Sequence, residues 1–213
     1  MPEFAKLLEG YERFRGEFYK HHEGQYSKLA EHGQHPELMI ISCSDSRVDP
    51  AQIFDVDPGD IFVVRNVAAL VPPEHDGDDL DGVAAAVEFA VGVLKVRQIV
   101  VMGHSLCGGC QAALTNAMAG REPGEGGYVA RWVNLLSEQR KAISQEVGNE
   151  GAAAKRAMEH AAVRASIANL RTYSQVAARE VEGSLVLRGT HFTIHDGMLH
   201  VLNQETGEFL PAE

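Results

Sequence analysis

The sequence predicts an α/β protein with a mostly parallel central sheet, an antiparallel hairpin at one edge, helices wrapped around the sheet and a helical arm at the N-terminus. Two observations support this fold class. Through the middle of the 213-residue chain, short apolar runs rich in β-branched residues alternate with helix-like segments, which is the pattern of strands buried in a parallel sheet. Near the C-terminus, two strand-like runs instead flank a tight turn at Asp196-Gly197, as in a hairpin.

A chain of this length suits a single domain, 1–213, within which four segments follow one another. They are a helical arm (1–33), a core with the candidate metal ligands (34–120), a helical region (121–182) and the terminal strands (183–213). No internal repeat or low-complexity tract interrupts this order.

The arm is predicted to form amphipathic helices, because its large apolar residues recur at helical spacing among charged ones. These residues are Phe4, Leu7, Leu8, Tyr11, Phe14 and Phe18. Such an arm either covers the core of its own chain or contacts a second copy in an oligomer, and the sequence leaves both possibilities open. Four histidines near it lie at no metal-ligand spacing with the cysteines and are expected to be solvated: His21, His22, His32 and His35.

Three apolar runs in the core predict the parallel strands, at Leu38–Ser42, Ile61–Val64 and Ile99–Met102. Each run has the length of a strand and is bounded by turn-forming or charged residues. Between the first two runs, Asp49-Pro50 is expected to open a short helical turn.

The connection from the second strand to the third contains a loop and a helix. Prolines exclude a helix at 70–74, so this segment is expected to be extended. An acidic loop follows at 76–81, and its last residue, Asp81, is placed to cap a helix that continues to Leu94.

The rest of the chain supplies the outer layer and the hairpin. It is predicted to form a helix, a surface loop, two long Ala-rich helices and two strands, at Gln111–Ala119, Gly120–Gly127, Tyr128–Val147, Ala152–Glu182, Leu185–Ile194 and Leu199–Leu202. The two long helices are expected to lie across a face of the sheet.

Composition narrows the class of protein. The chain has 30 acidic and 19 basic residues and a formal charge of −11, which argues against nucleic acid or an anionic membrane surface as a partner. No apolar run reaches the roughly 18 to 20 residues of a membrane span, and the N-terminus lacks the pattern of a signal sequence. We therefore expect a cytoplasmic protein, in which three cysteines point to metal binding or catalysis rather than to disulfides.

Cysteine and histidine side chains follow two of the predicted strands at the point where each strand ends. Cys43 comes directly after the first strand, and His104 and Cys107 follow the third. The carboxyl ends of neighbouring parallel strands meet at one edge of a sheet, which is where α/β folds place their chemistry. Two thiolates and one imidazole favour zinc, and a set of three protein ligands leaves a fourth position open for water or substrate.

Asp45 and Arg47 follow the first cysteine at a spacing of two residues. If this segment is extended, both side chains point to the same side, where the planar guanidinium suits the carboxylate. Beside a metal, Asp45 is placed to accept the proton of a zinc-bound hydroxide in a hydrogen bond and so orient it, while Arg47 keeps Asp45 ionised.

These residues resemble the β-class carbonic anhydrases over about 34–113. The motifs that carry the resemblance are Cys43-Ser44-Asp45-Ser46-Arg47, Phe62 to Ala68 with Arg65-Asn66, Gly82 with Glu88, and Gly103-His104-Ser105-Leu106-Cys107-Gly108-Gly109. The resemblance implies zinc on Cys43, His104 and Cys107, an Asp45–Arg47 dyad, and reversible hydration of carbon dioxide to bicarbonate and a proton by attack of zinc-bound hydroxide.

The resemblance also implies a substrate pocket and an assembly. Substrate-binding positions of the family fall on Gln34, Phe62, Val67, Phe89 and Gly108, with Phe89 standing where many relatives have tyrosine. The pocket is completed by a neighbouring subunit, which implies a homodimer or a larger even homo-oligomer. Ile40 occupies the position where the allosteric kind of the family has tryptophan, so the chain resembles the plant-like kind, in which zinc keeps its open place.

Three alternatives remain. Cys107-Gly108-Gly109-Cys110 forms a C-x-x-C motif at a helix start, which suits thiol–disulfide chemistry but leaves Asp45, Arg47 and His104 unexplained. The same zinc site also suits hydrolysis of carbonyl sulfide or carbon disulfide. A purely structural zinc module would have no use for the Asp45–Arg47 pair.

Overall fold

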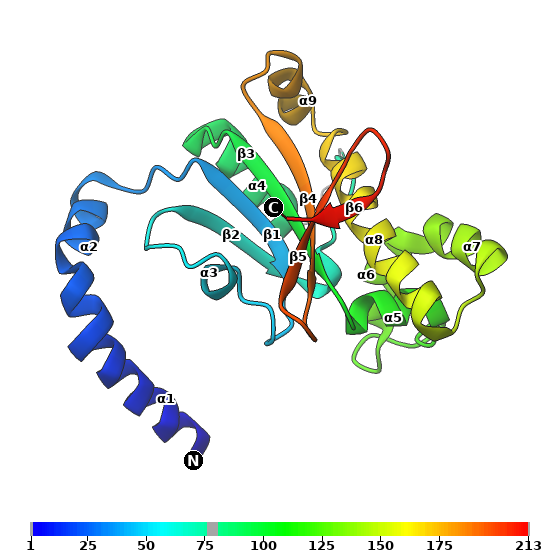
Figure 1. Ribbon diagram of the computed structural model, residues 1–213, viewed down its shortest axis with the longest axis horizontal. Coiled ribbons are helices and arrows are strands. Elements are labelled where there is room, and N and C mark those ends of the chain that lie inside the picture. Colours follow the sequence, from blue (N-terminus) through cyan, green and yellow to red (C-terminus); the bar gives the residue numbers. More distant parts are fainter. Residues whose placement is uncertain (1, 76–80, 213) are drawn as a thin grey trace.

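A six-stranded sheet forms the centre of the computed structural model, which describes residues 2–75 and 81–212. The strand order is β2-β1-β3-β4-β5-β6, and Figure 1 shows the strands side by side. The bounds are β1 Leu38–Cys43, β2 Ile61–Asn66, β3 Gln98–His104, β4 Val186–Thr193, β5 Met198–Leu202 and β6 Phe209–Pro211. The pairs β2–β1, β1–β3 and β3–β4 are parallel, and the pairs β4–β5 and β5–β6 are antiparallel. The predicted fold class is confirmed, with β6 as a short strand that the sequence pattern did not reveal.

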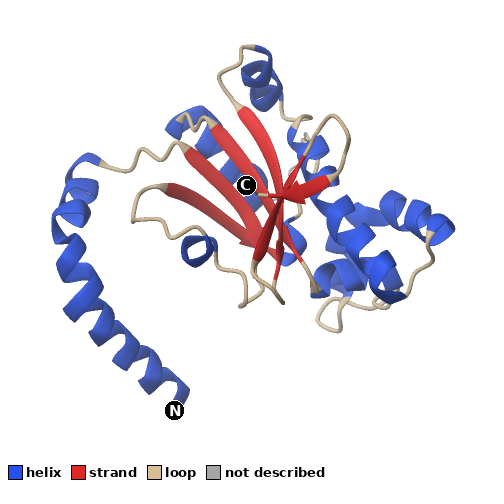
Figure 2. Cartoon of the chain, in the orientation of Figure 1, coloured by secondary structure: helices blue, strands red, loops and turns tan. Residues whose placement is uncertain are grey.

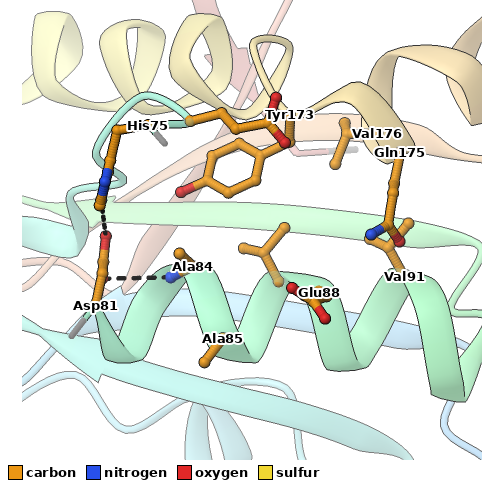
Figure 3. Close-up of a pocket in the computed structure, with 11 residues that line it drawn as sticks. His75, Asp81, Ala84, Ala85, Glu88, Val91, Tyr173, Gln175 and Val176 are labelled. Carbon is orange, nitrogen blue, oxygen red and sulfur yellow. Dashed lines mark hydrogen bonds and ion pairs between the residues drawn. The ribbon is translucent and has the colours of Figure 1, made fainter. Parts of the chain in front are cut away.

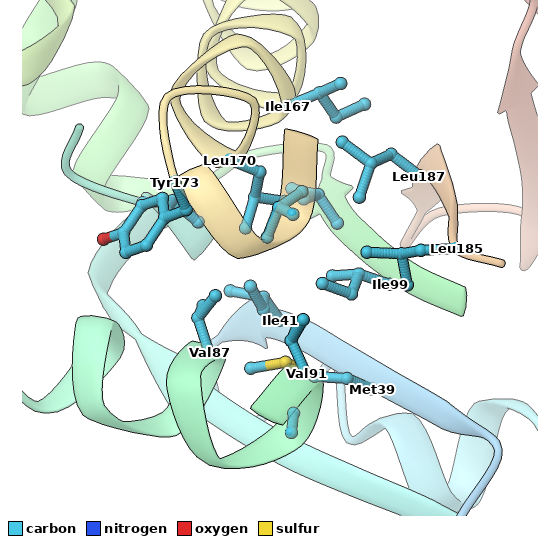
Figure 4. Close-up of a cluster of buried hydrophobic side chains, with 14 of the residues drawn as sticks. Met39, Ile41, Val87, Val91, Ile99, Ile167, Leu170, Tyr173, Leu185 and Leu187 are labelled. Carbon is cyan, nitrogen blue, oxygen red and sulfur yellow. The ribbon is translucent and has the colours of Figure 1, made fainter. Parts of the chain in front are cut away.

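The two central strands β1 and β3 are buried on both faces, which explains why their sequences are largely apolar rather than alternating. On one face, Met39, Ile41, Ile99 and Val101 belong to a cluster with residues of α4, η3 and α8, drawn in Figure 4. Intervening strand residues belong to a second cluster, which continues past the strand ends into α5–α8.

Helices and short helical turns connect the strands and pack around the sheet. Their bounds are α3 Pro50–Ile53, α4 Gly82–Glu88, η3 Phe89–Leu94, α5 Gly108–Thr115, α6 Gly127–Val133, η4 Asn134–Leu136, α7 Ser137–Glu146, α8 Gly151–Leu170 and α9 Ser174–Val181. Figure 2 shows the helices from α5 to α8 gathered on one side of the sheet and the N-terminal arm on the other. Asp81 caps α4 as predicted, accepting from Val83 N at 2.8 Å and Ala84 N at 3.3 Å. Most of the predicted acidic loop at 76–81 lies outside the described residues.

Three predicted helices have different bounds in the structure. The segment Ala152–Glu182 is two helices, because the chain turns at 171–173, where Tyr173 is extended and buried and donates its hydroxyl to Pro72 O at 3.1 Å. The segment Tyr128–Val147 is interrupted by the 3₁₀ turn η4. The helix expected at Gln111–Ala119 begins at Gly108 and ends at Thr115, followed by Asn116 in the left-handed conformation.

The N-terminal arm is a nearly continuous helix that stands away from the body of the chain (Figure 1). It consists of α1 Pro2–Phe14, the π-helical turn η1 Arg15–Tyr19 and α2 Lys20–His32. Its second half contacts the described body, for example through Gln25 Nε2, which donates to Pro58 O at 2.7 Å. Of the two roles that the sequence leaves open, the arm does not cover the core of its own chain, since Leu7 is 69% exposed and neither η1 nor α2 buries a residue.

His22 departs from the prediction that the arm histidines are solvated. Its ring stacks on Phe18 with centroids 4.1 Å apart, and its Nε2 lies 3.2 Å from Asp57 Oδ1. Its side chain is 18% exposed, because the end of the arm returns to the body there. Within the described part of the chain, no helix is both long enough and apolar enough to cross a bilayer.

Candidate metal centre

Cys43, His104 and Cys107 converge at the carboxyl edge of the sheet. Parallel pairing places Ser42 opposite Met102, so the ends of β1 and β3 lie level, and Cys107 directly precedes α5. The three ligand atoms lie within 4.8 Å of one another, and all three residues are buried. Among residues 2–75 and 81–212, this is the one group of histidine, cysteine and acidic side chains that is arranged to hold a metal ion. The predicted convergence is confirmed.

The imidazole of His104 is prepared for a metal. A carbonyl oxygen only accepts, so His104 Nδ1–H donates to Ser105 O at 2.8 Å, which leaves Nε2 with its lone pair. Nε2 is buried and has no hydrogen-bond partner. Buried polar atoms almost always have a partner, and metal-binding histidines are oriented by such a bond at the other nitrogen. The unpaired Nε2 beside two thiols therefore fits zinc, for which the set supplies three ligands.

The two thiols respond strongly to their surroundings. Contact with Cys107 and burial raise the pKa of Cys43 to about 12, and contact with Cys110 together with burial raises that of Cys107 to about 12. The backbone N–H of Ala68 donates to Cys43 Sγ at 3.4 Å, which favours a thiolate. Because thiolates are the metal-binding form, zinc binding releases protons, and its affinity rises with pH.

Asp45 and Arg47 form a two-pronged ion pair beside the metal ligands. Arg47 Nε donates to Asp45 Oδ1 at 2.9 Å and Nη2 to Oδ2 at 2.7 Å. This guanidinium holds the pKa of the Asp45 carboxyl well below its usual range. The two side chains meet in a turn, closed by Val48 N donating to Asp45 O at 3.1 Å, so the premise of an extended segment is wrong although the pairing exists.

Arg65 has a role that sequence reasoning missed. From β2, its Nε donates to Cys43 O at 3.0 Å, Nη2 to Asp45 O at 2.8 Å and Nη1 to Asp49 Oδ2 at 2.7 Å. It therefore holds the backbone of the turn that carries Asp45. The available signal was a cation at the end of an apolar strand, at the edge where the ligands gather.

Glu159 of α8 is the second residue that was missed. Its buried carboxylate accepts from Leu106 N at 2.7 Å through Oε1 and lies 3.2 Å from His191 Nε2 through Oε2. The signal in the sequence was the only acidic residue of an Ala-rich helix, next to the buried Met158.

The residues that the resemblance assigns to the substrate fall into two places. Val67 and Gly108 lie beside the metal ligands, since Val67 packs against Gly109 so closely that a Cβ there would lie 2.7 Å from Val67 Cγ1. Phe62 and Phe89 instead contact each other, with ring centroids 5.8 Å apart.

The register of the sheet determines where Phe62 and its neighbour Phe89 lie. Phe62 pairs with Met39, whereas the metal edge is marked by the pairing of Asn66 with Cys43. Gln34 is exposed and precedes the amino end of β1. Gln34, Phe62 and Phe89 therefore do not join the metal ligands of their own chain.

A cavity of about 350 Å³ lies away from these ligands, between α4 and the start of α9. Figure 3 shows His75 and Asp81 at one end, Tyr173 across the cavity, and Glu88 and Gln175 toward the other end. None of its lining residues belongs to the metal group or to the Asp45–Arg47 pair.

The buried metal group lies close to the surface of this chain. Leu106 is 60% exposed and Val67 38% exposed beside it.

Known proteins resemble this chain over the residues that contain these motifs. Residues 38–199 match the family model described as carbonic anhydrase. The chain is 33% identical over 204 residues to a carbonic anhydrase of Synechocystis sp., covering 92% of this chain and 72% of that protein.

Among solved structures, the β-carbonic anhydrase CcaA superposes with a TM-score of 0.91 at 30% identity, covering 100% of this chain and 93% of that one. A tetrameric β-carbonic anhydrase of Sordaria macrospora superposes with a TM-score of 0.79 at 28% identity, covering 95% and 98% of the two chains. The similarity thus extends over nearly the whole chain, including the arm and the terminal strands.

Proposed function

Because this chain belongs to the β-class carbonic anhydrase family, we propose that it catalyses the reversible hydration of carbon dioxide to bicarbonate and a proton, with zinc as its cofactor. The observation that carries the proposal is the buried group of Cys43, His104 and Cys107, with an unpaired imidazole nitrogen. The chemistry of this set suits a catalytic zinc with one open position.

Each residue has a distinct task in this proposal. Cys43, His104 and Cys107 hold the metal. Zinc, when bound there, lowers the pKa of a coordinated water, so that a nucleophile is available near neutral pH. Asp45 stays ionised because Arg47 keeps its pKa low, so it is too weak a base to take up a proton at neutral pH. It therefore acts by accepting a hydrogen bond that orients the attacking oxygen, while Arg47 fixes the direction of the carboxylate.

Assembly is part of the same proposal. The exposed apolar side chains of the arm and the open surface around Leu106 and Val67 support a homodimer or a larger even oligomer. In that assembly, Gln34, Phe62 and Phe89 of a neighbouring chain complete the substrate pocket. The tetrameric state named for the Sordaria macrospora relative is compatible with this arrangement.

The proposal also places the chain in the plant-like kind of the family. Ile40 is buried in β1 at the position where the allosteric kind has tryptophan. The bonds from Arg47 hold both carboxylate oxygens of Asp45, which opposes movement of Asp45 onto the metal. We therefore infer that the fourth zinc position stays open.

The thiol–disulfide alternative finds little support. Cys43, Cys107 and Cys110 are all free and buried. A redox cysteine needs a lowered thiol pKa, whereas the pKa of Cys107 is raised to about 12. Cys110 instead packs in the apolar cluster of α5.

The deciding experiment measures zinc content and stopped-flow hydration of carbon dioxide on the same purified sample. We expect one zinc per chain and hydration that a chelator abolishes. Two thiols should become titratable only after chelation, whereas a redox dithiol would react without it. Carbonyl sulfide and carbon disulfide are tested in parallel: turnover of either one without hydration of carbon dioxide would overturn the proposed substrate.

A further inference from the structure

Glu159 links helix α8 to the loop between His104 and Cys107. The residue is 5% exposed, and both of its carboxylate oxygens are engaged. Oε1 accepts from the backbone N–H of Leu106 at 2.7 Å, and Oε2 lies 3.2 Å from His191 Nε2 on β4. A buried carboxylate is costly to desolvate unless it is hydrogen-bonded in this way, so its placement against one particular peptide group needs an explanation.

Leu106 has an unusual backbone. Its φ is +58°, in the left-handed region where the Cβ of an ordinary residue crowds its own carbonyl group. Side-chain packing does not account for this conformation, because Leu106 is 60% exposed. Its two peptide groups, however, are both held: the N–H by Glu159, and the C=O by Arg47 Nη2 at 3.2 Å.

We propose that Glu159 is a positioning residue, which holds Leu106 in its left-handed conformation and thereby fixes Cys107 and the Asp45–Arg47 pair relative to each other. The same Arg47 Nη2 that binds Leu106 O also donates to Asp45 Oδ2 at 2.7 Å. A change in the direction of the Leu106 peptide therefore moves the support of the dyad and the start of the Cys107 ligand together. The inference rests on the proposed function only for its effect on turnover.

The surroundings of Glu159 are packed in a way that suits a fixed support. The ring of His191 meets that of His160 edge-on at 4.7 Å, and His160 stacks on Phe209 at 4.1 Å. On the other side, Ser105 anchors the same loop to β4 by donating its N–H to Phe192 O at 2.9 Å. The loop is thus held at two neighbouring peptide groups, one by a strand and one by a side chain from α8.

The test compares zinc release and turnover in substituted holoenzymes. In Glu159→Ala, we expect zinc to transfer to a competing chelator about 10-fold faster, and kcat per bound zinc to fall about 10- to 100-fold, with little change in KM, as when other supporting contacts of metal sites are removed. In Glu159→Gln, the amide oxygen still accepts from Leu106 N–H, so both values should stay within about threefold of the wild type. If Glu159→Ala folds poorly, Glu159→Asp takes its place in the test. Aspartate retains the charge, but its side chain is too short to reach Leu106 N–H, so we expect the same faster zinc release and lower kcat.

The matched control is Ile167→Ala, on the same helix. Ile167 lies eight residues beyond Glu159, about two turns further along α8, and it is buried in one apolar cluster with Val163 and Leu170. This substitution should lower the melting temperature while leaving zinc release and turnover per zinc unchanged. It therefore separates loss of stability from loss of positioning.

A second variant tests the cause directly. Glycine adopts positive φ at little cost, so a chain with Leu106→Gly should depend less on Glu159. We expect the acceleration of zinc release caused by Glu159→Ala to be about threefold smaller in the Leu106→Gly background than in the wild-type background. Zinc release from Glu159→Ala that equals the wild type, or an effect that is unchanged in the glycine background, would overturn the inference. Failure of the proposed function would appear differently, as a zinc-loaded wild type that does not hydrate carbon dioxide, while the release measurements would still decide the role of Glu159.

Discussion

The metal edge of the sheet and the N-terminal arm differ in how their positions are determined. At the metal edge, Arg65 and Glu159 reach across from β2 and α8 to hold individual backbone groups. The arm, in contrast, is helical over 31 residues from Pro2 to His32, and the polar contacts that it makes with the described body come from its second half, at His22 and Gln25. Its apolar residues remain exposed, Leu7 at 69% and Phe4 at 61%.

The difference indicates where each region obtains its stability. Helices without tertiary contacts are marginal in water even when their sequences favour them, and large exposed apolar surfaces mark interaction sites. The metal edge is therefore complete within one chain as a ligand set, whereas the arm is expected to need a second chain. Both statements can be tested by substitutions confined to one region.

The largest effect is expected from removing a metal ligand. Cys43→Ser should abolish stoichiometric zinc binding and lower hydration activity by about 1,000-fold or more, because the nucleophile depends on the metal. Zinc content and stopped-flow hydration measure both effects. The control is Cys110→Ser, which changes a buried cysteine outside the ligand group and should retain zinc. Equal loss of activity in the two variants would instead favour chemistry at the C-x-x-C motif.

A smaller effect is expected at the dyad. Asp45→Asn should retain one zinc per chain but lower kcat/KM for hydration by about 100-fold, because the neutral amide no longer fixes the attacking oxygen through a charged acceptor. Arg47→Lys should fall between this variant and the wild type, since lysine cannot make the two-pronged contact. Full activity of Asp45→Asn at normal zinc content would show that the carboxylate has no catalytic part.

The arm provides the third comparison. Replacing Leu7 and Tyr11 by serine should leave zinc content unchanged but weaken self-association by about 10-fold or more, because both side chains are exposed in the single chain and available to a partner. Analytical ultracentrifugation measures the association, and hydration per zinc should fall with it as the shared pocket opens. Replacing the exposed Val181 on α9 by serine is the control. An unchanged oligomer in the arm variant would contradict the proposed assembly.

The metal edge was predictable from the sequence because its signals are local. Cys43, His104 and Cys107 each follow an apolar run. Because the carboxyl ends of neighbouring parallel strands lie at one edge of the sheet, this order alone predicts that the three side chains converge. The arm was predictable as a helix but not in its position, since amphipathic spacing shows that an apolar face is covered without identifying what covers it.

The parts that were missed depend on contacts distant in the sequence. Arg65 lies 16 to 22 residues from the groups that it holds and Glu159 lies 53 residues from Leu106, separations that no spacing pattern reports. The break at Tyr173 has the same cause, because the turn is stabilised by packing and by a bond to Pro72, 101 residues earlier. Long-range contacts of this kind override the helix propensity of an Ala-rich segment.

The smallest expected effect is a loss of stability at low pH in the body of the chain, away from the arm. Burial and the neighbouring His191 lower the pKa of His160, which follows Glu159 in α8, to about 3. An unfolded histidine instead titrates near 6.5. Below about pH 6.5 the unfolded chain therefore binds a proton that the folded chain does not, so this residue makes folding less stable as pH falls toward 3. Between pH 7 and 5 the loss is at most about 2 kcal/mol.

Denaturant unfolding followed by the fluorescence of Trp132, the only tryptophan of the chain, measures this loss at the metal edge, because its indole donates to Val67 O at 2.7 Å. His160→Phe retains a ring to stack on Phe209 and removes the titration, so the variant should lose less stability than the wild type over the same interval. Protonation of the zinc ligands affects both proteins equally and cancels in the difference. If the two proteins lose the same stability over this interval, His160 is not held neutral by the fold.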